Sequence, residues 1–331
     1  MNAFPSTTWT SSEGTELPDD RQKGNDMKNL EELLFLQSLP GLGKASVYRN
    51  YFNLLPQAEG IDDLTGMLGM DVSSAVRVKE SVKKQIDDLL SRRNLTVITA
   101  LDDEYPVFLD ALGSKKPLVL YVLGDASLLL SPGIAVAGTR CPSAHTRRIE
   151  PGLIRNLIEF TGEPIVSGLA AGCDAIAHEA AMNFHGKTVA VLPSGFDHIF
   201  PAENRCLAER IADGGGCLIS EYLPCMLAQK YTFTERDGLI AALSHTIFAV
   251  ECGMSSGTMA TVKAAKSMKR KLRCYIPVDM ELGDFSGNEY MVREMGAVAV
   301  RNTAGLRAVL EGIPGMEQSI QGRPPAAARP A

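Results

Sequence analysis

Short apolar runs alternate with segments of helical rhythm between residues 131 and 276, and this alternation constrains the fold more than any other feature of the chain. The apolar runs predict strands at 134–137, 164–167, 187–192, 216–219, 246–250 and 272–276. The intervening segments predict helices at 145–161, 173–185, 203–213, 235–243 and 257–269. Because alternation at this spacing is typical of βαβ crossovers, we expect an α/β fold with a mostly parallel sheet. Uninterrupted runs such as TVAVL are typical of strands covered on both faces.

The chain divides into parts of different composition. We expect a disordered tail over 1–26, a small helical domain over 27–93, an α/β domain over 94–313 and a flexible tail over 314–331. In the helical domain, a PGLG turn separates two helical segments, which resembles a helix-hairpin-helix, and two more short helices are expected after Ile61. The α/β domain opens with β-rich runs at 95–99 and 117–124 and closes with a helix, a short strand at 297–300 and a final helix.

Charge and cysteine content exclude several classes of protein. A net charge of −6 argues against nucleic-acid binding by bulk positive charge, although it leaves room for a local basic groove. The seven cysteines are scattered without a C-x-x-C pair, which predicts neither a zinc site nor a disulfide framework. The polar start and the absence of an 18-residue apolar stretch predict no secretion signal and no membrane span. We therefore expect a cytoplasmic protein.

The sharpest turn is Gly138-Thr139-Arg140, which follows the first buried strand and leads toward Ser143. Glycine lets the backbone approach an anion, amide N–H groups at the next helix start donate to it, and arginine adds a charged contact. The residues alone support a phosphate site and an ordinary βα turn equally. The turn lacks both the G-x-G-x-x-G and the G-x-x-x-x-G-K-[ST] patterns, which argues against standard dinucleotide and P-loop sites.

Similar turns follow later strands, at Ser167-Gly168, at Ser194-Gly195 and, after Glu251, at Ser255-Ser256-Gly257-Thr258. All of them fall at the carboxyl ends of parallel strands, where such sheets bind ligands, so together they could line one crevice. Tight packing and plain helix capping explain the same residues without a ligand.

Two basic residues need separate interpretation. Lys187 precedes its strand, at the opposite end of the sheet, and the pattern favours a solvated lysine. Arg236 is placed in the first turn of the helix predicted at 235–243, where the helix dipole disfavours a cation, so it indicates an anionic partner. It could equally pair with Glu235 or Glu221.

His178 lies one helical turn after Asp174, which invites an acid–base or metal-site interpretation. No further ligand or nucleophile has a matching motif, so a structural histidine is favoured.

Taken together, these residues resemble the DNA-processing protein A family (DprA, also called Smf). The matching segments run in order over roughly 175 residues: Asp103-x-Tyr105-Pro106-x-x-Leu109, 117–124, Gly138-Thr139-Arg140, 167–178, 186–204, Ser220-Glu221, Phe233-x-x-Arg236, 240–244 and Glu251 with Ser256-Gly257-Thr258-x-x-Thr261. The chain departs from the family's R-N-R where it reads Arg236-Asp237-Gly238, and no winged-helix domain is evident after residue 278. The added carboxylate and the lost basic side chain predict a lower affinity for DNA.

The resemblance implies an extended Rossmann-like fold behind a helical domain of the sterile-alpha-motif or helix-hairpin-helix kind. It also implies a non-enzymatic homodimer that binds single-stranded DNA, without cofactor or metal, and delivers it to a RecA-type recombinase in natural transformation or recombination. By position, it assigns phosphate contacts to Arg140, Ser167, Gly168, Lys187, Arg236, Ser256 and Gly257. The glycine turns add Gly138, Thr139, Ser143, Gly195 and Thr258 to the candidate site.

A second hypothesis is a nucleotide-binding sensor or nucleotide hydrolase of the related Rossmann-like superfamily. It would use Glu251 and the Ser256-Gly257-Thr258 turn. The P-G-G-x-G-T signature of the phosphoribohydrolase branch is represented only by SSGT, which favours the DNA-binding hypothesis.

Overall fold

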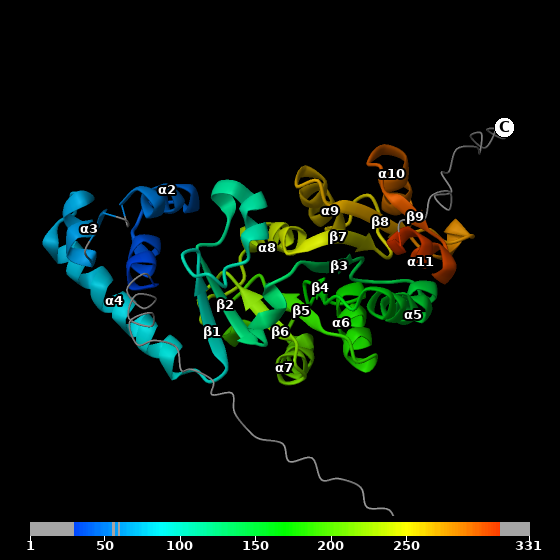
Figure 1. Cartoon of the computed structure of the whole chain (residues 1–331), viewed down its shortest axis with the longest axis horizontal. Coiled ribbons are helices and arrows are strands. Elements are labelled where there is room, and N and C mark those ends of the chain that lie inside the picture. The colour runs from blue at the N-terminus through cyan, green and yellow to red at the C-terminus, as the bar shows by residue number, and fades with distance from the viewer. Residues whose placement is uncertain (1–29, 55–56, 59, 312–331) are drawn as a thin grey trace, which may run out of the picture.

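A nine-stranded sheet runs through the molecule (Figure 1), in a computed structural model that describes residues 30–54, 57–58 and 60–311. Its strands are β1 Leu95–Thr99, β2 Val119–Gly124, β3 Gly133–Ala137, β4 Ile165–Ser167, β5 Thr188–Val191, β6 Cys217–Ser220, β7 Ser244–Ala249, β8 Lys271–Tyr275 and β9 Val298–Val300. Their order is β1-β2-β6-β5-β4-β3-β7-β8-β9. The seven strands from β6 to β9 are parallel, and β1 and β2 add an antiparallel hairpin beside β6. The predicted α/β fold is confirmed.

The chain reverses its direction of travel across the sheet at β3. It proceeds from β3 through β4 and β5 to β6, and then returns to the other side of β3 to add β7, β8 and β9. The helices that follow β3 and β7 therefore lie on opposite faces, which opens a crevice at the carboxyl ends of these two strands.

Helices cover both faces of the sheet, as the buried strands require. One face carries α5 Ala144–Thr161, α6 Cys173–Asn183, α7 Arg205–Asp213 and α11 Thr303–Glu311. The other carries α8 Lys230–Ala242, α9 Thr258–Ser267 and α10 Ser286–Glu294. The strands alternate their side chains between the two layers: Ile134 and Val136 pack with α5 and α6, whereas Ala135 packs with α8 and α9.

Helix α8 begins five residues before the predicted start at 235. Gln229 caps this helix. Its backbone N–H donates to the Thr232 hydroxyl at 3.0 Å, and its side chain accepts from the backbone N–H of Thr232. A usual capping box has Ser or Thr at the N-cap and Glu or Gln three residues later. Here the order is reversed, with Gln229 at the N-cap and Thr232 three residues later, so the sequence pattern did not reveal the start of the helix. Arg236 consequently lies in the second turn, and the prediction that it opposes the helix dipole in the first turn was wrong.

The N-terminal helices form one end of the molecule (Figure 1). A helix over residues 30–38, α2 Lys44–Leu54 and α3 Ile61–Met67 precede α4 Val72–Ser91. The last is a 20-residue helix rather than the short one predicted, and Asp71 caps its start by accepting from the Ser74 N–H at 2.9 Å. These helices share one apolar cluster with Leu118, Val119 and Tyr121, so they pack directly on the β1-β2 hairpin.

The expected terminal tails over 1–26 and 314–331 lie outside the described residues. Within the part of the chain that the structure describes, no helix is long and apolar enough to cross a bilayer. All seven cysteines are free.

Candidate functional site

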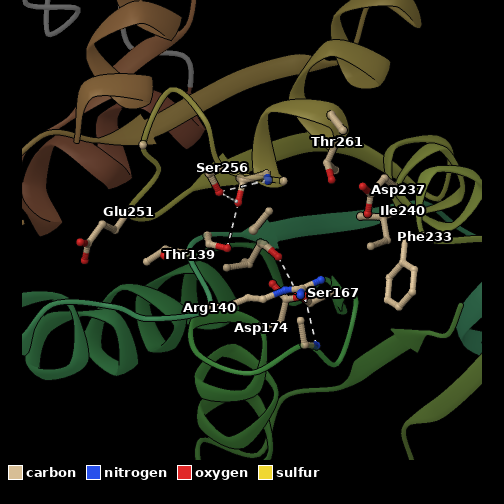
Figure 2. A pocket seen from close by; sticks show the side chains of 18 of the residues that line it. Thr139, Arg140, Ser167, Asp174, Phe233, Asp237, Ile240, Glu251, Ser256 and Thr261 are labelled. Carbon is tan, nitrogen blue, oxygen red and sulfur yellow. Dashed lines mark hydrogen bonds between the residues drawn. The ribbon is translucent and has the colours of Figure 1, made fainter. Parts of the chain in front are cut away.

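A pocket of about 640 Å³ occupies the crevice at the carboxyl ends of β3, β4 and β7 (Figure 2). We call it the crevice pocket. Figure 2 shows Glu251 at one end and Phe233 at the other, with Arg140, Ser167 and Asp174 along the wall between them. Eight of the predicted site residues line it: Gly138, Thr139, Arg140, Ser167, Arg236, Ser256, Gly257 and Thr258. The prediction that several glycine turns meet in one crevice is confirmed for these turns.

Hydrogen bonds join the turns after β3 and β7. The Thr139 N–H donates to the Glu251 carbonyl at 2.8 Å, and the Thr258 hydroxyl donates to the Gly138 carbonyl at 2.8 Å. Gly138 itself has no room for a side chain, because an added Cβ would lie 2.5 Å from the sulfur of Cys173 at the start of α6. The turn geometry is therefore set by tight packing from both neighbouring helices, which holds Arg140 at the pocket rim.

Arg140 is exposed, and its guanidinium makes no hydrogen bond or ion pair with any residue that the structure describes. Its guanidinium carbon lies 5.9 Å from the centre of the Phe233 ring. The ring of Phe233 in turn meets that of Phe200 edge to face at a centroid separation of 5.3 Å, and Phe200 is 44% exposed. A smaller hollow of about 190 Å³, lined by both rings and by Ala171 and Glu203, adjoins the crevice pocket. The rim thus combines a free cation with aromatic surface.

Arg236 is buried beneath this rim. Its Nη1 atom lies 3.8 Å from Oδ2 of Asp174 and 3.4 Å from Oδ1 of Asp237, so its partners are neither Glu235 nor Glu221, which the sequence had suggested. Gly168 makes room for it, because a Cβ at that position would overlap the guanidinium. The Nε atom of Arg236 has no partner among the described residues. This nitrogen is buried, so Arg236 contributes to the pocket mainly through its charge.

Asp174 organises the wall below Arg236. Its Oδ2 atom accepts from the backbone N–H groups of Gly168 and Ala170, at 3.2 and 3.3 Å. Burial raises the pKa of Asp174, and the Arg236 guanidinium opposes that rise. The Ser167 hydroxyl donates to the Val136 carbonyl at 2.7 Å, which ties β4 to β3. Asp174 and Ser167 thus position the site, because their polar atoms already have protein partners.

His178 pairs with Thr188 at 2.7 Å. Burial lowers the pKa of His178 to about 3, so the ring is neutral at ordinary pH. These contacts support the structural interpretation of this histidine.

Asp237 is the carboxylate that the family pattern lacks, and it lines the crevice pocket beside Arg236. Burial raises its pKa to about 6, and the negative charge of Asp174 adds to that effect, while Arg236 and Arg140 oppose it. Above that pH, an anion in this pocket would therefore lie beside the negative charge of Asp237. Below that pH, it would lie beside a neutral acid.

The turn before α9 combines a helix cap with an open backbone donor. The Ser256 hydroxyl accepts from the Thr258 N–H at 3.2 Å and donates to the Thr258 hydroxyl at 3.0 Å. Nothing lies within 4 Å of a Cβ added at Gly257, so the backbone there is open to the pocket. The capping interpretation therefore applies to the Ser256 hydroxyl, and the anion-site interpretation applies to the open backbone at Gly257.

Four predicted site residues do not line the crevice pocket. Ser143 caps α5 and donates its hydroxyl to Glu251 at 2.9 Å, and Gly168 lies beneath Arg236. Gly195 is packed so closely against the Leu223 and Pro224 carbonyls that it admits no side chain. Lys187 precedes β5 at the amino-terminal edge of the sheet and lies over Gly215. The pattern placed Lys187 correctly, at the edge of the sheet opposite the crevice pocket, and the phosphate contact that the family resemblance assigns to it stays a prediction.

Glu251 does not have the environment of a catalytic base. Its Oε2 atom accepts from the N–H and the hydroxyl of Ser143, each at 2.9 Å, and Oε1 accepts from the Asp284 N–H at 3.2 Å. Since both oxygens have protein donors, this carboxylate links the turn after β7 to the starts of α5 and α10. That arrangement does not favour the nucleotide-hydrolase hypothesis.

Sequence reasoning missed the aromatic rim. Aromatic residues make up only 6% of the chain, and Phe200 and Phe233 converge from segments far apart in sequence. The signal that could have found them was the F-x-x-R spacing, which places Phe233 and Arg236 one turn apart on a helix.

A family model described as DNA recombination-mediator protein A matches residues 96–311. Protein Smf of Synechocystis sp. is 34% identical over 241 residues, which are 69% of this chain and 58% of that protein. The chain therefore spans little more than half the length of this relative.

Two solved structures share the fold. DNA processing protein A from Streptococcus pneumoniae superposes with a TM-score of 0.68 at 27% identity, over 85% of this chain and 97% of that one. DNA processing protein A from Helicobacter pylori, whose structure was described for its single-stranded DNA binding mode, superposes with a TM-score of 0.57 at 27% identity, over 66% and 96% of the two chains.

Proposed function

Because the chain belongs to the family of DNA recombination-mediator protein A, we propose that it binds single-stranded DNA in the crevice pocket and does not catalyse a reaction on it. The observation that carries the proposal is the unpaired guanidinium of Arg140, exposed above a ring of Phe233 at the pocket rim. An arginine beside an aromatic face suits the two parts of a nucleotide that every sequence has in common, the phosphate and the π-face of the base.

The proposed contacts follow from the groups left open in the pocket. A phosphate takes the Arg140 guanidinium and the backbone around Gly257, with the charge of Arg236 below it. A neighbouring base stacks on the exposed aromatic surface of Phe200 and Phe233, beside the smaller hollow. These contacts read no base edge, so we expect binding that tolerates any sequence and weakens as salt rises.

We extend the proposal to the cellular role that the family suggests. A cytoplasmic homodimer would hold incoming single-stranded DNA in transformation or recombination and deliver it to a RecA-type recombinase. The support is the family match and the likeness to two DNA processing proteins.

Replacing Arg140 with alanine is expected to weaken binding of a dT oligonucleotide about tenfold at low salt, because it removes a charged phosphate contact. Fluorescence anisotropy at several salt concentrations measures the effect. The slope of log affinity against log salt should also fall in size by about 0.7, the value for one phosphate contact on a single strand.

The control for this experiment is Arg148→Ala, which removes the same charge from the exposed side of α5, outside the pocket. It should leave the affinity near the wild-type value. Equal losses in the two variants would mean that overall charge, and not the crevice, governs binding. Absence of any wild-type binding at low salt would refute the proposed function.

Lys187→Ala is expected to leave the affinity for the same oligonucleotide within about twofold of wild type, because Lys187 stands at the opposite edge of the sheet and salt screens its charge from the pocket. The same anisotropy titration tests it. A loss as large as that of Arg140→Ala would show that the strand continues over the amino-terminal edge.

A further inference from the structure

Helix α9 begins at the crevice pocket, and lysines that the proposed contacts do not use follow on its exposed side. Lys263 and Lys266 lie one turn apart on the helix, Lys269 comes just after it, and Lys271 begins β8. All four side chains are exposed. We call these four residues the lysine row.

No carboxylate balances the lysine row. The segment from Cys252 to Val278 contains six lysines and arginines and no aspartate or glutamate, in a chain whose net charge is −6. Among the described residues, none forms an ion pair with any of the four lysines, and Lys266 donates only to the backbone carbonyl of Glu294, at 3.3 Å. The row is therefore a local excess of positive charge on an acidic protein.

Acidic residues neutralise basic residues on other helices of the same surface. Arg155 of α5 pairs with Glu159 at 2.6 Å, and α10 carries a pair of the same length and spacing. The helix dipole accounts for Lys266, which lies in the last turn of α9, but it does not account for Lys263 or for the lysines beyond the helix. Such a concentration of unbalanced charge on one exposed side indicates an anionic partner.

The lysine row continues directly from the crevice pocket. Gly257 and Thr258 line the pocket at the start of α9, and the exposed Ala260 lines it one step further along the helix. Residues three apart are neighbours on a helix surface, so Ala260, Lys263 and Lys266 form one exposed stripe that leads away from the pocket. Because α9 has ten residues, this stripe lengthens the positive surface by about 15 Å.

We propose that a single strand of DNA held in the crevice pocket continues along the exposed side of α9, with its phosphates at the lysine row. This inference rests on the proposed function and adds the direction in which the strand leaves the pocket. Lysine ammonium groups act as point charges on phosphates, so these contacts would tolerate any sequence. Since the strand is already anchored beside the row, the second set of contacts forms within one complex.

A nucleic-acid strand suits the lysine row better than an acidic protein does. Between residues 255 and 277, all of which the structure describes, no large apolar side chain is exposed. Protein interfaces have an apolar core inside a polar rim, whereas non-specific binding of a single strand needs mainly positive charge along its path. The surface of α9 offers the charge without the apolar core.

The test compares dT oligonucleotides of two lengths on the full chain by fluorescence anisotropy. The shorter, of about six nucleotides, occupies the crevice pocket alone, and the longer, of about fifteen, also reaches α9. The double variant Lys263→Gln, Lys266→Gln should bind the longer one about tenfold more weakly than wild type at low salt. The slope of log affinity against log salt should fall in size by about 1.4, as expected for two phosphate contacts. Affinity for the shorter one should stay within about twofold of wild type.

The matched control is Lys83→Gln, Lys84→Gln, which removes two exposed lysine charges from α4, outside the crevice pocket. It should bind both oligonucleotides like wild type. Wild-type affinity of the α9 variant for the longer oligonucleotide, or equal losses at both lengths, would overturn the inference while DNA binding in the crevice stands. Failure of the proposed function looks different, because wild type would then bind neither length. Binding of a decaglutamate peptide by wild type but not by the α9 variant, without competition from DNA, would assign the row to an acidic protein instead.

Discussion

Replacing Arg236 with methionine is expected to lower the free energy of unfolding by about 3 kcal/mol, because the buried Asp174 carboxylate loses its cation. Urea denaturation at neutral pH measures the loss. Adding Asp174→Asn to the same chain should restore most of it, since the amide oxygen can still accept from the Gly168 and Ala170 N–H groups without carrying a charge. Neither variant should bind single-stranded DNA at wild-type affinity, so the restored double variant separates stability from binding.

The matched control is Arg210→Met, because Arg210 forms an ion pair of 4.0 Å with Glu179 at which both side chains are about half exposed. Its removal should cost less than about 0.5 kcal/mol. The loss in Arg236→Met should also shrink as pH falls, because protonation of Asp174 removes the unpaired charge. A loss no larger than that of the surface control would mean that Asp174 does not depend on Arg236.

Asp237→Asn is expected to raise the affinity for single-stranded DNA about tenfold at mildly alkaline pH, because it removes a negative charge from the wall of the crevice pocket. In wild type, burial raises the pKa of Asp237 to about 6. The carboxylate is therefore charged above that pH and neutral below it, so wild-type affinity should rise as pH falls through about 6. Asp237→Asn should remove that rise.

Proton uptake gives a second measure of the same effect. A bound phosphate favours the neutral form of Asp237, so above pH 6 binding should draw up to one proton from the buffer. Titration calorimetry in two buffers of different ionisation enthalpy detects this uptake in wild type and should find it absent in Asp237→Asn. The exposed acid Asp213→Asn serves as the control and should behave like wild type. A pH dependence that persists in Asp237→Asn would assign it to another group.

Local patterns predicted the strands well, because each strand is a short buried run whose end is marked by a turn residue. The run before Gly138 became β3 Gly133–Ala137, and the run before Ser167 became β4 Ile165–Ser167, each within a residue of expectation. The same logic predicted that the turns after β3, β4 and β7 share one edge, since parallel strands end on the same side. Helix α8 was predicted less well because a side-chain cap sets its start.

The ion-pair and hydrogen-bond partners of the polar side chains could not be predicted from the sequence. Arg236 was expected to find Glu235 or Glu221, but both carboxylates face Lys44, which lies 177 residues before Glu221 in the sequence. Arg236 instead pairs with Asp174 and Asp237, across the space that Gly168 leaves open. Ser143 was expected at a phosphate, but the turn after β7 brings Glu251 to it.

The sequence by itself therefore determined the alternating α/β fold and the edge of the sheet at which a ligand would bind, because hydrophobic period and turn chemistry act over a few neighbouring residues. Tertiary structure alone decided which polar side chains are satisfied and which remain open, because that depends on which distant segments the strand order brings together. The reversal at β3 places Phe233, Asp237 and Gly257 opposite Arg140, and it leaves the guanidinium of Arg140 without a partner among the described residues.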